Sequence, residues 1–440
     1  MKITLIYLGI SWSGFNTFGK KDCGECNFIH HGIASIAAYL KENEVEVNYL
    51  DLRKLKNWDD FRKKIKEDKN NIFGISSTTV DFDYSIKAAK IIKKIKPKSK
   101  IIVGGVHPTV RPGDALKIKE FDYVVTGEGE LSILEIIKAI SKRKKIKRLV
   151  IGESCDLRNI PHIDRDLFDH RHGEMINPFV SDLEVPFTTV MSSRGCPYNC
   201  TFCQPAERMV FKGKVRLRDM KDVVSELVEI NEKYGLKSFL IHDDLFILSR
   251  ERILEFISLY KKSGLTAKFM CQGRADLIIR YEKEIGKLAR VGLIGMMIGF
   301  ESGSQKILDF LHKGTTVKDN LRSADICRKY GVKIWANYML GIPSENYWDM
   351  IKTLVMIRKI KPDYYSPSLF TPYPETGLYD YCKERNLLIF KHFNQYRRSL
   401  SGDKIKGFNY SVIRLMIFLF MPFKKKKEII IYMFNQFWKK

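Results

Sequence analysis

The chain has 440 residues, with 76 lysines and arginines against 51 aspartates and glutamates, which gives a formal net charge of +25 at pH 7. Apolar residues make up 45% of the sequence, too many for a disordered chain, and 29 glycines and 14 prolines are too few for a collagen-like repeat. At roughly 150 residues per domain, this length predicts two or three domains. Each is long enough to bury a core of its own.

The nine cysteines indicate a reducing compartment. Their number is odd, their spacing is irregular, and a strand-like run begins directly at Lys2 with no signal peptide before it. A secreted disulfide framework is therefore disfavoured. We expect a cytoplasmic protein in which clustered cysteines bind metal or take part in chemistry.

The positive charge is spread along the whole chain, in runs such as residues 93–96 and 142–145. Because lysines on helix faces are usually solvated, a lysine-rich surface is favoured over a nucleic-acid interface, which the same charge would also suit. We therefore do not expect a nucleic-acid partner.

The first third of the chain alternates short apolar runs with stretches of helical periodicity. Strands are predicted at residues 2–8, 45–50, 72–76, 101–103 and 123–126, and helices at residues 33–40 and 84–95. This alternation predicts an α/β fold with a doubly wound parallel sheet. Ligands of such sheets bind beyond the carboxyl ends of the strands, so the residues that follow each strand form the candidate site.

Small, hydroxyl-bearing and charged residues follow three of these strands. They are Ser76, Ser77, Thr78, Gly104, Gly105, His107, Gly127 and Glu128. Hydroxyl groups and bare backbone let a large ligand lie close. Together these segments resemble the Rossmann-like cobalamin-binding domain that precedes radical SAM enzymes, over roughly residues 1–145. The resemblance implies that they line a groove for the nucleotide tail of cobalamin.

The loop between the first strand and the first helix contains further candidates. The Asp-x-His-x-x-Gly ligand motif of methionine-synthase-like cobalamin domains is absent, but His30 and His31 lie in this loop. One hypothesis is that either imidazole approaches cobalt, and the alternative is a helix-capping or surface pair. Cys23 and Cys26 have no two partner ligands nearby, so we interpret them as loop thiols and not as a zinc site.

Residues 146–186 interrupt the periodicity with Pro161 and mixed charge. We interpret this segment as an inter-domain linker. It resembles the Pro-x-x-Asp-Arg connector of the same family.

A strand-like run at residues 187–191 leads into Cys196, Cys200 and Cys203, in the spacing C-x3-C-x2-C. Three thiolates on one short loop can hold three irons of a [4Fe–4S] cube. No fourth cysteine or histidine lies between Phe187 and Lys212, so the fourth iron is open to a ligand that is not protein. The alternative is zinc, but closed zinc sites favour four ligands. The motif resembles the radical SAM signature, which implies that S-adenosylmethionine (SAM) binds this iron through its amine and carboxylate.

Strands recur after the cysteine motif, with helices between them. We place them at residues 187–191, 238–241, 267–271, 296–300, 333–340 and 363–370. This rhythm predicts a partial (β/α)6 barrel within residues 187–390, with catalytic groups at the carboxyl ends of its strands.

Charged residues follow the second and third of these strands. Asp243 and Asp244 stand where the resemblance puts the segment that holds the SAM amino group, and paired acids suit an ammonium ion. Helix capping by Asp244 is the alternative. Arg274 carries a two-donor fork suited to a carboxylate, with a surface salt bridge as the alternative.

Two later segments resemble further SAM-binding segments of the family. In the first, the resemblance implies that Glu301 contacts the methionine or ribose of SAM and that Ser302 permits close backbone approach. In the second, which begins at Asn337, it implies that Ile342 packs on adenine. Ser344 replaces a glycine of the family here, and serine tolerates positive φ poorly.

Residues 371–377 resemble the Pro-x-Pro-Gly-Thr turn of the family, with Glu375 in place of glycine. Tyr373 in this turn is a candidate catalytic residue that lines the substrate cavity. A plain turn residue is the alternative.

Residues 391–440 depart from the barrel pattern and form a basic and apolar segment that we expect to be helical. The apolar stretch at residues 412–423 is too short to cross a bilayer, which needs about 20 residues, and four lysines follow it at residues 424–427. One interpretation is a helical unit packed on the barrel. The other is an interfacial segment on anionic lipid, which would make the protein peripheral at the membrane.

As a whole, the resemblance implies a cobalamin-dependent radical SAM enzyme that uses a [4Fe–4S] cluster, SAM and cobalamin. It implies an electron donor such as flavodoxin or ferredoxin, reductive cleavage of SAM, and C-methylation of an unactivated carbon. Oxidative cyclisation, rearrangement or carbon–carbon bond formation with the same cofactors is the alternative, and a tRNA-modifying methylthiotransferase is a further one. The apolar tail points to a small-molecule or lipid-like substrate.

Overall fold

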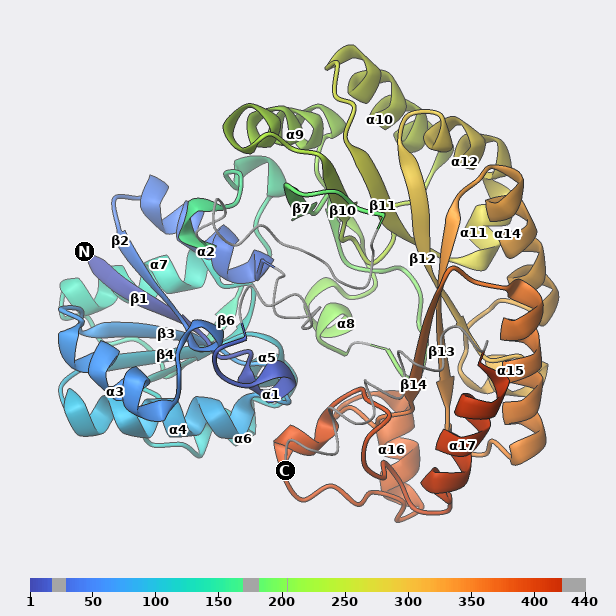
Figure 1. The fold of residues 1–440 in the computed structure, drawn as a ribbon. Coiled ribbons are helices and arrows are strands. Elements are labelled where there is room, and N and C mark those ends of the chain that lie inside the picture. Colours follow the sequence, from blue (N-terminus) through green and yellow to red (C-terminus); the bar gives the residue numbers. More distant parts are fainter. Residues whose placement is uncertain (18–28, 169–181, 204, 422–440) are drawn as a thin grey trace.

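The computed structural model describes residues 1–17, 29–168, 182–203 and 205–421. Two α/β units lie side by side, with helix α8 (Pro205–Phe211) between them (Figure 1). The first unit contains the sheet of the first 152 residues, and the second contains the barrel-like sheet.

The first sheet has six parallel strands in the order β2-β1-β3-β4-β5-β6. The strands are β1 (Lys2–Tyr7), β2 (Glu46–Asp51), β3 (Ile72–Ser76), β4 (Lys100–Gly104), β5 (Tyr123–Gly127) and β6 (Leu149–Gly152). The expected doubly wound sheet is confirmed. It has one strand more than expected, because β6 lies inside the segment interpreted as linker, where four residues are too short a run to give a pattern.

Helices cover both faces of this sheet. Helices α2 (His31–Glu42) and α7 (Glu130–Ser141) pack on one face, and α3 (Trp58–Glu67), α4 (Phe82–Ile95) and α6 (Pro112–Leu116) pack on the other. Shorter elements follow strand ends or join the units: α1 (Ile10–Ser13), α5 (Val106–Val110), and the 3-10 turns η2 (Leu52–Lys54), η3 (Leu157–Asn159) and η4 (Asp166–Phe168).

The second sheet also has six parallel strands, in the order β14-β13-β12-β11-β10-β7, which confirms the expected partial barrel. The strands are β7 (Phe187–Val190), β10 (Ser238–Ile241), β11 (Lys268–Gly273), β12 (Leu293–Glu301), β13 (Lys333–Leu340) and β14 (Tyr364–Leu369). The helices around it are α9 (Met220–Tyr234), α10 (Arg250–Lys262), α11 (Ala275–Arg280), α12 (Glu282–Ala289), α13 (Gln305–Phe310), α14 (Val317–Lys329), α15 (Tyr347–Ile360) and α16 (Gly377–Glu384).

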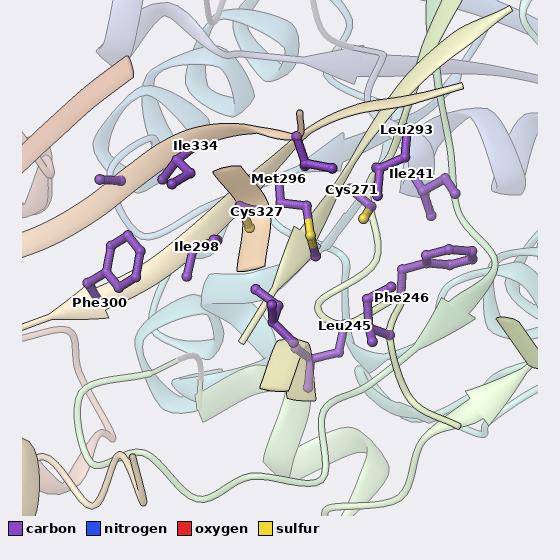
Figure 2. Close-up of a cluster of buried hydrophobic side chains, with 14 of the residues drawn as sticks. Ile241, Leu245, Phe246, Cys271, Leu293, Met296, Ile298, Phe300, Cys327 and Ile334 are labelled. Atoms are coloured by element: carbon purple, nitrogen blue, oxygen red, sulfur yellow. The ribbon is translucent and has the colours of Figure 1, made fainter. Parts of the chain in front are cut away.

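The core of this unit lies between the strands and the outer helices. Ile241, Cys271, Met296 and Ile298 meet the helical layer there (Figure 2). Because side chains alternate along a strand, the intervening residues of β12 and β13 face the inside of the barrel.

The segment after the barrel packs back on both units. The 3-10 turn η5 (Phe393–Tyr396) contacts α4 of the first unit, where the Phe393 amide donates to Asp83 Oδ2 at 3.1 Å. Helix α17 (Tyr410–Phe420) packs on α15 through buried Ile413 and Ile417, as the packed interpretation of the tail expected for these residues. Within the described residues, no helix combines the length and the apolar character needed to cross a membrane.

Candidate active site between the two sheets

The three cysteines of the motif lie on one loop between β7 and α8. Cys200 is buried, and Cys196 and Cys203 are half-buried. Burial raises the pKa of the Cys196 thiol to about 11, and the charges of nearby Asp244, Cys203 and Cys200 act in the same direction. Three thiols that lie within electrostatic reach of one another need positive charge to become thiolates together. This donor set therefore fits an iron cluster, which supplies that charge.

Asp243 fastens the start of the cysteine loop to the end of β10. Its carboxylate accepts from the backbone amides of Ser192 and Ser193 at 2.6 and 3.2 Å and from their hydroxyls at 2.5 and 2.8 Å. The side chain is fully buried. The structure thus gives Asp243 four partners within the protein, whereas we had expected it to bind the ammonium of SAM.

Asp244 remains the carboxylate available to a ligand at this strand end. It is half-buried, and both burial and the charge of Asp243 raise its pKa. It does not cap helix α10, because Ser249 accepts the capping bond from the Arg252 amide.

Arg274 lies beside the cysteine loop. Its guanidinium stacks on the ring of Tyr198 at 3.7 Å, and its Nη1 lies 3.9 Å from Cys200 Sγ. It also donates to the carbonyl of Lys313 and pairs with Asp276 at 2.7 Å. Arg274 is therefore buried at the sulfur ligands, and the surface salt bridge we considered is not what the structure shows.

Glu301 ends β12 in a left-handed conformation, with φ of 60°. Its Oε1 accepts from Lys313 Nζ at 3.0 Å, in a buried pair. Ser302 is also buried and shares a hydrogen bond with the hydroxyl of Thr353 at 3.0 Å. The left-handed backbone at Glu301 is a strained conformation, of the kind found at functional sites. It places the Glu301–Lys313 ion pair at the carboxyl end of β12, next to the cysteine loop.

The loop after β13 is held by Glu345. One of its carboxylate oxygens accepts from the amides of Gly341 and Ile342 at 2.7 and 3.1 Å, and burial raises its pKa to about 8. Ser344 adopts φ of 69°, so the position where the family has glycine requires positive φ. Ile342 is fully buried, and Asn337 lies half-buried on the inner face of the barrel.

In the turn after β14, a residue other than glycine again adopts a positive φ where the family has glycine, since Glu375 has φ of 63°. Tyr373 is half-buried, its ring lies 6.2 Å from that of Tyr396, and Arg398 lies over it at 5.2 Å. These contacts hold the ring in place at the turn.

The carboxyl edge of the first sheet forms a tight backbone cradle. Gly105 has φ of 98°, and a Cβ there would lie 2.9 Å from the Ser77 carbonyl and 3.2 Å from the Ser76 hydroxyl. Ser77 itself accepts from the hydroxyl of Ser85 at 2.7 Å, and Thr78 donates to Asp81 at 2.8 Å. Gly104, Gly105 and the Ser76–Thr78 loop therefore meet, as expected for residues that line one groove.

His107 follows Gly105 at the same edge, in helix α5. It is fully buried against the rings of Phe82 and Phe393, with centroid distances of 4.0 and 4.8 Å, and burial lowers its pKa to about 4. We had expected His107 to bind the cofactor. The structure makes it part of the contact with the segment that follows the barrel.

Glu128 also has partners other than the expected cofactor. Its carboxylate binds Arg194 and Arg216 at 2.5 Å each, and both arginines flank the cysteine loop. Gly127, with φ of 77°, allows the close approach of β6, where a Cβ would lie 2.6 Å from the Gly152 carbonyl.

His30 and His31 lie at the start of α2. His30 caps the helix by accepting from the Ile33 amide at 3.1 Å, and its Nε2 lies 3.3 Å from the hydroxyl of Ser76. His31 Nε2 lies 2.7 Å from the hydroxyl of Thr189 in the second unit. The capping alternative is thus observed for His30, and Cys23 and Cys26 lie outside the described residues.

Sequence reasoning gave no functional role to Lys313, Arg194 or Arg216. Lys313 follows the segment of Glu301 and Ser302 by about a dozen residues, and its contact with Glu301 is visible only in the fold. The two arginines carry no local signal, because their partners come from the other unit.

Comparison with known proteins places these features in one family. The radical SAM superfamily model matches residues 190–357, and the B12 binding domain model matches residues 25–137. The chain is 29% identical to an uncharacterized methyltransferase of Pyrococcus horikoshii, over 91% of this chain and 88% of that protein. It is 30% identical to a putative methylthiotransferase of Methanocaldococcus jannaschii, over 74% of each chain.

It is also 25% identical to the anaerobic magnesium-protoporphyrin IX monomethyl ester cyclase of Rubrivivax gelatinosus, over 82% of this chain and 68% of that protein. Among solved structures, the cobalamin-dependent SAM radical enzyme OxsB matches with a TM-score of 0.68 and 18% identity, over 90% of this chain and 56% of that one. The order of the two units and the cysteine loop between them agree with these matches. The chain therefore belongs to the cobalamin-dependent radical SAM enzymes, whose cofactors are a [4Fe–4S] cluster, SAM and cobalamin.

Proposed function

We propose that this enzyme methylates an unactivated carbon of a small-molecule or lipid-like substrate. The observation that carries the proposal is that α8, which directly follows the cysteine loop, packs on α5 and β5 at the carboxyl edge of the first sheet. This arrangement supports a reaction in which both cofactors act on one substrate carbon.

When bound, the cluster and SAM supply reductive SAM cleavage, and cobalamin supplies a methyl carrier. The protein groups beside the cysteine loop would bind and orient different parts of SAM. We assign the SAM ammonium to Asp244 and its carboxylate to Arg274, because each presents the opposite charge next to the loop. Glu301 would meet the methionine or ribose of SAM, with Lys313 holding its carboxylate in place. Ile342 would pack on adenine.

The inner face of the barrel favours an apolar substrate. The inward positions of β12 and β13 include Met297, Trp335 and Met339, with Asn337 and, at the start of β13, Lys333 as polar exceptions. Apolar walls exclude water, and this exclusion protects a carbon radical from side reactions. Tyr373 is the tyrosine we propose to line the substrate cavity.

The test is an anaerobic assay of the reconstituted enzyme with a reductant and candidate substrates. Methylation predicts a substrate mass increase of one methylene together with both 5′-deoxyadenosine and S-adenosylhomocysteine. The Cys200→Ala variant should form none of these products. Turnover without S-adenosylhomocysteine would refute methylation.

A cyclase or related radical reaction is the second candidate, favoured by the similarity to the Rubrivivax cyclase. It predicts 5′-deoxyadenosine without S-adenosylhomocysteine and no gain of a methyl group. The methylthiotransferase alternative, raised again by the archaeal relative, predicts sulfur in the product.

We also propose that the enzyme works in the reducing cytoplasm with a flavodoxin- or ferredoxin-like donor. All seven cysteines among the described residues are free thiols, which suits that compartment. Exposed Val412, Leu415 and Leu419 on α17 support contact with an anionic membrane, together with the lysines at residues 424–427. Vesicle co-sedimentation no better than that of a chain ending near Asn409 would refute this contact.

A further inference from the structure

The two arginines at the neck of the cysteine loop face one another on a short ribbon. Strand β8 (Ser193–Arg194) pairs antiparallel with β9 (Arg216–Leu217), so that Arg194 lies directly opposite Arg216. The segment between them carries the three cysteines and α8. Like charges that face each other across two strands destabilise the pairing. The neck therefore needs negative charge from elsewhere to stay closed.

That charge comes from the first unit. Glu128 Oε1 accepts from Arg194 Nη1 and from Arg216 Nη2, at 2.5 Å each, and so bridges both strands of the ribbon. Glu130 accepts from Arg194 Nη2 at 2.8 Å. The two glutamate side chains are 7% and 4% exposed, so water screens these pairs little.

The remaining contacts of Glu128 fix the orientation of its carboxylate. Its Oε2 accepts from the backbone amide of Cys155 at 2.8 Å, and the carbonyl of Cys155 accepts from Arg216 Nη1 at 2.5 Å. Although burial alone would raise the pKa of Glu128, Arg216 and Arg194 lower it, so the group stays ionised. This carboxylate directly follows Gly127, at the strand end that faces the cobalamin groove.

Glu128, Glu130 and Cys155 also bring three potential ligand atoms within 4.8 Å of one another. The two guanidiniums already neutralise both carboxylates, and burial raises the pKa of the Cys155 thiol to about 12. These facts argue for an ion-pair network and against a metal site.

We propose that Glu128 is a positioning residue that couples cobalamin binding to the conformation of the cysteine loop. The Gly127 loop at the groove edge would be restrained when cobalamin is bound, which would hold Glu128 on both arginines and keep the ribbon that flanks the cluster ligands closed. The inference rests on the binding of the two cofactors and does not depend on which radical reaction follows. The coupling can therefore fail while C-methylation stands, and C-methylation can fail while the coupling stands.

Hydrogen–deuterium exchange on the cluster-loaded full chain tests the coupling. Hydroxocobalamin should slow exchange of peptides from residues 193–217 by roughly fivefold or more, the lower end of typical coupling between sites. The Glu128→Gln variant should still bind hydroxocobalamin, seen by its absorbance after gel filtration, and should lose this protection.

Glu375→Gln is the matched control, because Glu375 also joins the two units, through Arg111 at 3.4 Å, but is exposed. It should keep the protection of the wild type. Should Glu128→Gln fail to hold a cluster, Arg216→Gln removes one side of the bridge and leaves the Arg194 pairs. Protection that persists in the tested variant, or that is absent from the wild type, would overturn the proposal.

Discussion

The adjacent aspartates after β10 should have opposite phenotypes when they are replaced. Asp243 accepts four hydrogen bonds from Ser192 and Ser193 and is fully buried. In Asp243→Ala, two buried backbone amides lose their acceptor, at about 1–3 kcal/mol each. The expected loss is therefore about 4 kcal/mol of unfolding free energy, and the cysteine loop loses its anchor. Iron content after anaerobic reconstitution should fall with it.

Asp244→Asn should leave the fold and the iron content unchanged and weaken SAM binding. A charge-assisted hydrogen bond contributes about 1.5–3 kcal/mol, so the Kd for SAM should rise roughly tenfold to a hundredfold. Calorimetric titration of cluster-loaded protein measures this change, and denaturant unfolding measures the other. The reasoning is refuted if Asp244→Asn binds SAM like the wild type, or if Asp243→Ala unfolds within about 1 kcal/mol of it.

Two further predictions concern pH. Although burial alone would raise it, Arg165 and Arg218 hold the pKa of Glu226 at about 2 against a usual 4.5, so Glu226→Gln should lose about 3 kcal/mol at neutral pH. Measured by denaturant unfolding, that deficit should shrink as pH falls from 4.5 towards 2. The control is Glu229→Gln, because Glu229 is exposed on the same helix, and this variant should lose under about 1 kcal/mol. A Glu226→Gln deficit that does not change with pH would contradict the assignment. Burial raises the pKa of Glu345 from 4.5 to about 8, so the wild type must lose stability as pH rises between these values. Glu345→Gln should therefore gain on the wild type by roughly 5 kcal/mol across that window. An equal pH dependence of the two proteins would show that Glu345 is ionised in the fold.

Local patterns in the sequence were sufficient for the sheets and for the cysteine loop. Apolar runs mark the strands, and the three cysteines fall within eight residues, so neither prediction needs long-range information. The two positions where this chain replaces a glycine of the family could also be recognised in the sequence. Ser344 and Glu375 both adopt positive φ, as the glycine they replace would require.

The partners of charged residues could not be predicted in the same way. Glu128 was placed correctly at a strand end, but its partners Arg194 and Arg216 lie 66 and 88 residues further along the chain. Strands β8 and β9 have two residues each, too few for any period. The hydrogen bonds of Asp243 could not be predicted for a similar reason, since Ser192 and Ser193 follow another strand.

The most direct test of the account is the electron paramagnetic resonance spectrum of the reduced, anaerobically reconstituted chain, recorded with and without SAM. The account predicts about four irons per chain, a cluster signal that changes when SAM is added, and no such signal in Cys200→Ala. Zinc in place of iron, or a cluster signal indifferent to SAM, would contradict it.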